Sequence, residues 1–183
     1  KQTGARLIGS RATLLYGRSA GLADEQMLEV KGHEEIACGK WTVKALPSIH
    51  GKALFGKIPL PGDMTEPPPY PPKFHHLKHG DVLNWWIDTG DLKIVHIDSA
   101  DFLDEHLSQV QADIVCLCAI GPKYRPHYVR DVIKHLKPKY IIPETMPLPD
   151  PVPVKPITPV PPDFPEPTEP GDGGGGYVID NDG

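Results

Sequence analysis

The chain of 183 residues has few cysteines, few aromatic residues and no long apolar run. Its longest apolar run, residues 114–120, is too short to cross a bilayer, so we expect no transmembrane segment. Lysine and arginine do not cluster and the formal net charge is −5, which argues against a nucleic-acid-binding surface. The three cysteines cannot all pair, and we interpret them as small buried residues of a reducing compartment, which favours the cytoplasm.

Proline and glycine, by contrast, are abundant, with 23 and 18 residues. Many of the prolines fall in residues 59–72, which we expect to form an extended loop, because proline interrupts helices and central strands. From residue 147 onward the sequence is rich in proline, glycine and acidic residues and has no apolar period. We therefore predict one incomplete domain at residues 1–147 and a disordered tail at residues 148–183.

Apolar patterns within residues 1–147 predict both strands and helices. Strands are predicted at residues 5–10, 27–30, 35–37, 41–46, 82–88, 92–98, 112–120 and 140–142. Helices are predicted at residues 11–16, 102–109 and 128–136. Strands 27–30 and 35–37 read as a hairpin, strand 41–46 should stop at Pro47, and strand 112–120 is apolar on both faces. The fold class is therefore α/β, with a mixed sheet covered by helices.

Polar residues follow three of the predicted strands. His50 comes just after strand 41–46, Asp101 follows strand 92–98, and residues 143–145 (PET) follow the last strand. Strand ends are places where a rigid sheet can project ligands into a shared cleft. Taken singly, each position fits a plain role equally well: a surface histidine, an aspartate that caps a helix, and an ordinary loop.

Together these segments resemble the metallo-β-lactamase superfamily, and most closely the branch of UlaG-like proteins and of phospholipase-D-type enzymes that act on N-acylated lipids. The resemblance covers the later two-thirds of that domain. It is carried by residues 4–10 (GARLIGS), 47–50 (PSIH), 96–101 (HIDSAD), 112–117 (ADIVCL) and 136–143 (LKPKYIIP). It implies part of an αββα sandwich.

The resemblance also implies a site. His50 would be a metal ligand, and Asp101 would be the carboxylate that bridges two metal ions, with Asp98 as the alternative register. The ions would be zinc, or manganese or iron in its place. Two such ions lower the pKa of a bridging water and give a hydroxide that attacks an ester, amide or phosphodiester bond of a small-molecule substrate.

The chain departs from the family pattern at two points. The His-x-His-x-Asp-His motif of the family is not found before residue 4, and Thr145 stands near the place of the last histidine ligand. Two ligands remain where a dinuclear site needs about six or seven. We therefore expect a metal-dependent hydrolase domain that is inactive as this chain, unless it assembles as an oligomer.

Other residues and other functions stay open. Arg125 and His127 follow strand 112–120 in a loop that faces the active site in the family, so they are candidate substrate contacts. His75, His76 and His79 could contact substrate or bind a metal adventitiously. The alternatives to a hydrolase are a non-catalytic binding module that keeps the scaffold, and a truncated gene product.

Overall fold

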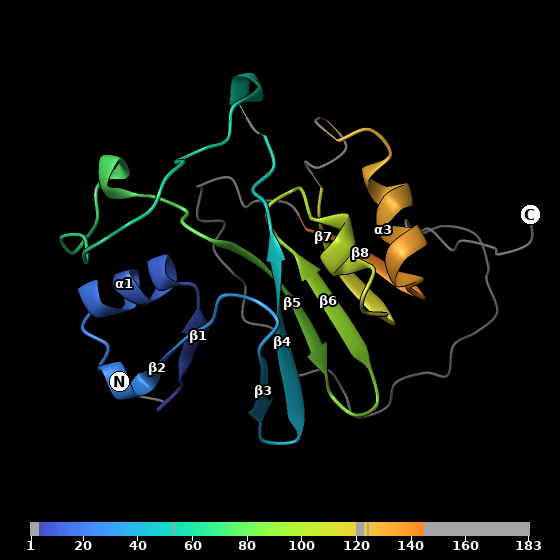
Figure 1. Cartoon of the computed structure of the whole chain (residues 1–183), viewed down its shortest axis with the longest axis horizontal. Coiled ribbons are helices and arrows are strands. Elements are labelled where there is room, and N and C mark those ends of the chain that lie inside the picture. The colour runs from blue at the N-terminus through green and yellow to red at the C-terminus, as the bar shows by residue number, and fades with distance from the viewer. Residues whose placement is uncertain (1–3, 53, 120–122, 124, 145–183) are drawn as a thin grey trace, which may run out of the picture. The chain divides into compact units, whose positions relative to one another are not determined.

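The computed structural model describes residues 4–52, 54–119, 123 and 125–144 (Figure 1). The predicted tail and Thr145 lie outside the described residues. Within them, no helix is long and apolar enough to cross a membrane.

A six-stranded mixed sheet forms the centre of the described chain, in the spatial order β3-β4-β5-β6-β7-β8. Its strands are β3 (Glu35–Cys38), β4 (Trp41–Ser48), β5 (Val82–Asp88), β6 (Lys93–Ile97), β7 (Ile114–Cys118) and β8 (Tyr140–Glu144). Strands β3 to β6 pair antiparallel in succession, whereas β6, β7 and β8 are parallel. The carboxyl ends of β4, β6, β7 and β8 therefore lie along one edge of the sheet (Figure 1).

A second, two-stranded sheet precedes it in the chain. Strands β1 (Leu7–Gly9) and β2 (Met27–Glu29) pair in parallel, and the connection between them contains helix α1 (Arg11–Ser19) and the 3-10 turn η1 (Asp24–Gln26). The apolar residues of α1 are buried against this pair of strands. Two further 3-10 turns, η2 (Leu54–Gly56) and η3 (Phe74–His76), interrupt the long connection between β4 and β5.

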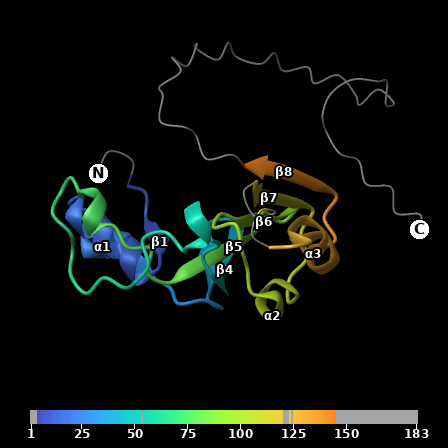
Figure 2. The same cartoon turned by 90° about the horizontal axis from the view of Figure 1, so that it is seen from above.

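Helices α2 (Asp104–Leu107) and α3 (Tyr128–Leu136) lie on the same side of the six-stranded sheet (Figure 2). They bury the main core, in which alternate residues of β6 and β7 face the helices. The core consists of Leu46, Val95, Ile97, Phe102, Leu107, Val110, Ala112, Val115, Leu117, Tyr128, Val132 and Leu136. On the other face of β7, Ile114 and Cys116 are half-buried and Cys118 is buried, so the covering of both faces expected from the sequence holds fully for the helix side and only in part for the other side.

The predicted α/β class with a mixed, helix-covered sheet is confirmed. The predicted hairpin of residues 27–30 and 35–37 is wrong, since β2 pairs with β1 and β3 pairs with β4. The segment between β2 and β3 does not form a hairpin turn. Instead, the backbone N–H groups of Lys31 and Gly32 donate to the carboxylate of Glu34.

The expected end of β4 at Pro47 is also wrong, because Pro47 pairs with Leu83 and the strand runs to Ser48. The N–H of Ala45 points toward β3 and donates to Glu34, and Pro47, two residues on, faces the same way. The pairing of β3 with β4 ends at Lys44. At Pro47 no strand therefore lies on that side to accept a hydrogen bond from the N–H that proline lacks.

The cysteines differ in their surroundings. Cys118 is buried, Cys116 is half-buried and Cys38 is exposed, and all three are free thiols. The expected burial therefore holds for Cys118 and fails for Cys38, which lies at the end of edge strand β3.

Candidate functional site

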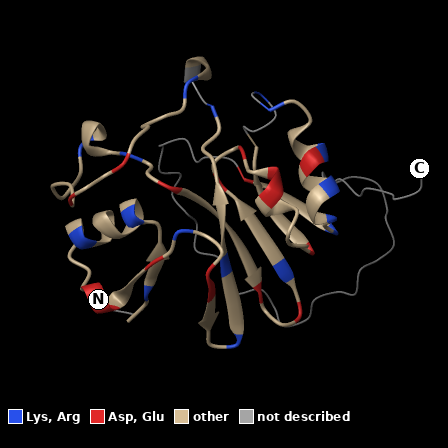
Figure 3. Ribbon diagram, viewed as in Figure 1, with Lys and Arg blue, Asp and Glu red and all other residues tan. Residues whose placement is uncertain are grey.

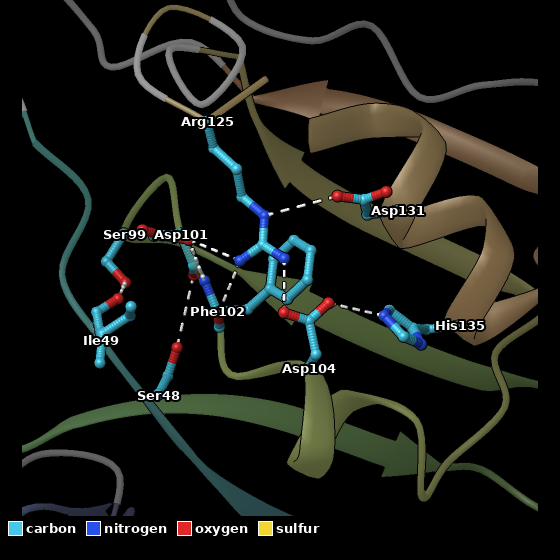
Figure 4. Close-up of polar contacts among 9 residues, drawn as sticks. All are labelled: Ser48, Ile49, Ser99, Asp101, Phe102, Asp104, Arg125, Asp131 and His135. Atoms are coloured by element: carbon cyan, nitrogen blue, oxygen red, sulfur yellow. Dashed lines mark hydrogen bonds and ion pairs between the residues drawn. The ribbon is translucent and has the colours of Figure 1, made fainter. Parts of the chain in front are cut away.

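The loop after β4 and the loop after β6 are joined by hydrogen bonds, although β5 lies between these strands. The N–H of Gly51 donates to the carbonyl of Ser99 at 2.6 Å. The hydroxyl of Ser99 donates to the carbonyl of Ile49 at 3.1 Å, and that of Ser48 to the carbonyl of Asp101 at 3.4 Å (Figure 4). Two of the strand ends singled out in the sequence thus form one rigid edge.

Gly51 allows this close approach. A Cβ atom at position 51 would lie 2.6 Å from the carbonyl oxygen of Ser99 and 2.8 Å from the carbonyl carbon of Ala100. Because these are backbone atoms, we expect Gly51→Ala to lower the free energy of unfolding by about 1–3 kcal/mol and to displace His50. Chemical denaturation checks this, with the exposed neighbour Lys52→Ala as a control that should stay within about 0.5 kcal/mol of the parent.

His50 borders a cavity of about 310 Å³ at this edge. Its ring Nδ1 lies 2.8 Å from the carbonyl oxygen of Gly51. A carbonyl can only accept, so Nδ1 carries the proton and Nε2 carries the lone pair. The cavity is lined by Ile8, Gly9, Ser10, Thr13, His50, His79, Asp81, Val82, Leu83, Trp85, Asp98 and Ser99.

The two candidate carboxylates occupy different surroundings. Asp98, the alternative register, lines the cavity together with His50. Asp101 is not among the lining residues. Its Oδ1 accepts a hydrogen bond from the backbone N–H of Phe102 at 2.9 Å and another from Arg125 at 2.9 Å. A metal at Asp101 would therefore have to share the carboxylate with a guanidinium group.

Arg125 lies at the centre of a polar network rather than facing the cavity (Figure 4). It donates to Asp101, to Asp104 at 2.7 Å and to the carbonyl of Phe102 at 2.8 Å. Its guanidinium carbon lies 3.8 Å from the centre of the Phe102 ring, a cation–π contact. Substrate contact by Arg125 stays a prediction, and these contacts assign its side chain a structural role.

His127, the other predicted substrate contact, is exposed at the start of α3 with a left-handed backbone at φ 63°. No cavity described at the sheet edge includes it among its lining residues. Its role stays a prediction.

Asp104 accepts from Arg125 and from His135 at 2.7 Å each, and it is one of two acidic residues on α2 (red in Figure 3). Partial burial raises the pKa of Asp104, but the hydrogen bonds from Arg125 and His135 outweigh it and hold the pKa below its ordinary value. A carboxylate whose pKa is lowered by folding stabilises the fold above its unfolded pKa of about 3.9, and this contribution is lost as the pH falls through the folded pKa.

We therefore expect acid to destabilise the parent chain more steeply than the Asp104→Asn variant below about pH 4. Urea denaturation at a series of pH values measures the difference between the two slopes. Glu105→Gln should follow the parent, because Glu105 lies on the same short helix but forms no ion pair with Arg125 or His135 in the described part of the chain. Equal slopes for the parent and Asp104→Asn would contradict the assignment.

His79 is a cavity residue that the sequence did not single out from its cluster. It lies beside His50, with ring centroids 5.1 Å apart, and both line the cavity. The register contains the signal that could have found it: Ser48 pairs with Val82, so residues just after β4 and just before β5 must meet. His75, by contrast, lies exposed in η3, where the half-buried His76 contacts it at 4.0 Å between ring centroids.

A second group of reactive side chains lies on the half-buried face of the sheet. His96 of β6 is 2.8 Å from the carboxylate of Glu144 of β8. Burial and the neighbouring Glu144 raise the pKa of Cys116, which keeps this thiol protonated and argues against a nucleophilic role.

No three or more histidine, cysteine, aspartate or glutamate side chains come close enough to hold a metal ion among the residues that the structure describes. The dinuclear site implied by the sequence resemblance is thus not assembled by the described residues. Two imidazoles in the cavity are the nearest approach to it.

Comparisons with known proteins do not show which family the chain belongs to. No protein-family model matches the chain. No curated protein matches it either. A solved structure of a mutant CmlA beta-hydroxylase is similar over 64% of this chain and 25% of that chain, with 15% sequence identity and a TM-score of 0.41. The chain therefore spans about a quarter of the length of that protein.

Proposed function

We propose that this chain carries part of the metal site of a metal-dependent hydrolase of the metallo-β-lactamase type. In this proposal, His50 is an imidazole ligand, and Asp101 or, in the alternative register, Asp98 is a carboxylate ligand. The observation that supports it most is the setting of His50. The ring stands at the carboxyl edge of the sheet, its Nδ1 is fixed by a backbone carbonyl, and its Nε2 is left as a donor beside a cavity.

The donor set fits this site only in part. A catalytic zinc usually has about three protein ligands and an open position for water. The described residues bring no such trio together. Hydrolysis of an ester, amide or phosphodiester bond is what the sequence resemblance implies, and we derive no step of it from the residues described. Zinc, manganese or iron as the metal, two ions per site, the small-molecule substrate and the cytoplasmic location likewise stay predictions.

Elemental analysis of the purified chain for zinc, manganese and iron tests the proposal. We expect metal in the parent chain and its loss in His50→Ala, with Asp101→Asn and Asp98→Asn deciding which carboxylate takes part. The His75→Ala/His76→Ala double variant is the matched control, because neither of these histidines lines the cavity. If His50→Ala retains as much metal as the parent, the proposal is wrong.

A non-catalytic binding module is the second candidate function. It is favoured by the engagement of Asp101 with Arg125 and by the lack of a three-ligand group in the described part of the chain. A panel of chromogenic esters, amides and phosphodiesters, assayed with added zinc, distinguishes the two. Turnover by the parent chain that is lost in His50→Ala supports the hydrolase, and equal background rates for both support the module.

A further inference from the structure

His79 is held in the cavity by a well-anchored loop. The preceding residue, Lys78, donates its N–H to the hydroxyl of Tyr16 on α1 at 2.8 Å. The following residue, Gly80, donates its N–H to the carbonyl of Gly62 at 3.2 Å. Anchors on both sides fix the position of the His79 ring, as a binding site requires.

The two nitrogen atoms of the His79 ring differ in their hydrogen bonding. Its Nδ1 lies 2.6 Å from the carbonyl oxygen of Gly80, so Nδ1 carries the proton and Nε2 carries a lone pair. Nε2 is fully buried and has no hydrogen-bond partner among the described residues. A buried polar atom without a partner costs about 1–3 kcal/mol, so an atom in this state marks a place where a ligand would be stabilised.

His50 shows the same arrangement, with Nδ1 bound to the carbonyl of Gly51. Donation of the second ring N–H to a backbone carbonyl is the usual way in which a metal-binding histidine is oriented. Two neighbouring histidines are thus oriented alike, each by the carbonyl of the glycine that follows it, and each leaves Nε2 as the donor atom.

The spacing of the two rings suits one shared ion. A zinc–nitrogen bond is about 2.0–2.1 Å and the imidazole centre lies about 1.1 Å further on, so two ligands at a tetrahedral angle place their ring centroids about 5.2 Å apart. The observed centroid separation of His50 and His79 is 5.1 Å, with the ring planes tilted by 31°.

We propose that His50 and His79 form a two-histidine site for a transition metal of the zinc class. The inference rests on the proposed function for His50, and it adds His79, which the sequence resemblance does not place among the metal ligands. Water completes the coordination, since the cavity of about 310 Å³ has room for it and no third side-chain ligand joins the pair among the described residues. Imidazole donors suit zinc, copper, nickel and iron better than magnesium or calcium.

Calorimetric titration of the full chain with Zn²⁺, and with Mg²⁺ as the hard-cation control, tests this site. We expect zinc to bind and His79→Ala to weaken it at least about tenfold, since loss even of a ligand's hydrogen-bond partner costs 10–100-fold in affinity. His75→Ala/His76→Ala should bind zinc as the parent does. Unchanged affinity in His79→Ala, or loss of binding in the His75/His76 double variant alone, would overturn the inference.

Two further measurements show that a loss of zinc binding is not caused by misfolding, and they distinguish the two proposals. In the parent chain, the Nε2 resonances of His50 and His79 should both shift when Zn²⁺ is added in ¹⁵N NMR, and a shift of His50 alone counts against His79. His79→Gln, which keeps a polar side chain, should melt near the parent temperature and still lose zinc. Weakened binding in His50→Ala and Asp101→Asn but not in His79→Ala would keep the proposed function and reject the pair. Absence of zinc binding in the parent would reject both.

Discussion

Phe102→Ala is expected to lower the free energy of unfolding by about 3–5 kcal/mol, the largest effect of any single change considered for this chain. Phe102 is 1% exposed, and its ring packs at 5.7 Å from the ring of Tyr128 in the core between the helices and the sheet. Truncation removes the apolar contacts, leaves a cavity, and also takes away the ring on which Arg125 rests.

Urea denaturation followed by circular dichroism measures this loss. Phe74→Ala is the matched control, because Phe74 is 77% exposed and should change stability by about 0.5 kcal/mol or less. A loss for Phe102→Ala as small as that of the control would show that the helices do not pack on the sheet as described.

Arg125→Ala is expected to destabilise the chain by about 2–3 kcal/mol, below the 3–5 kcal/mol typical of fully buried pairs, because the site is partly open. The Arg125 side chain is 18% exposed, and it pairs with Asp101, 24% exposed, and Asp104, 52% exposed. Its removal leaves two neighbouring carboxylates without their cation and also removes the contact with Phe102.

The same denaturation experiment tests Arg125→Ala. Arg130→Ala is its control, because Arg130 on α3 is 70% exposed and lies 4.0 Å from the carboxylate of Asp131. We expect a change within about 0.5 kcal/mol for the control. Since loss of Arg125 should also free the carboxylate of Asp101, zinc affinity measured in this variant shows whether Asp101 joins the metal site. Equal stability of the two variants would contradict the structural role of Arg125.

Local pattern predicted much of the fold. The strand at residues 82–88 and the helix at residues 128–136 match β5 and α3 to the residue, because a mostly apolar run that ends at a turn and a stripe of Val129, Val132, Ile133 and Leu136 each specify one geometry. Gly90 has a positive φ in the turn after β5. Strand pairing was harder to predict. Strands β1 and β2 pair although a helix intervenes in the sequence, and no local pattern distinguishes this arrangement from a hairpin.

The candidate site, like the fold, could be predicted only in part. The position of His50 at a strand end could be predicted, because it follows from the order of residues in the chain and from the direction of the strand. The partners of Asp101 and His79 could not, because both depend on loops far apart in sequence. Arg125 reaches Asp101 across 24 residues, and His79 is placed by contacts with α1 and with the proline-rich connection. The histidine cluster at residues 75–79 reads as one feature in the sequence, yet the structure separates its first two members from its last.

Anomalous X-ray scattering at the zinc edge, from a crystal of the full chain soaked in Zn²⁺, tests the central claim most directly. The account predicts a peak in the cavity about 2.0–2.1 Å from Nε2 of His50, with Nε2 of His79 at a similar distance. A zinc-soaked crystal with no peak in the cavity, or with zinc only at His75 and His76, would contradict it.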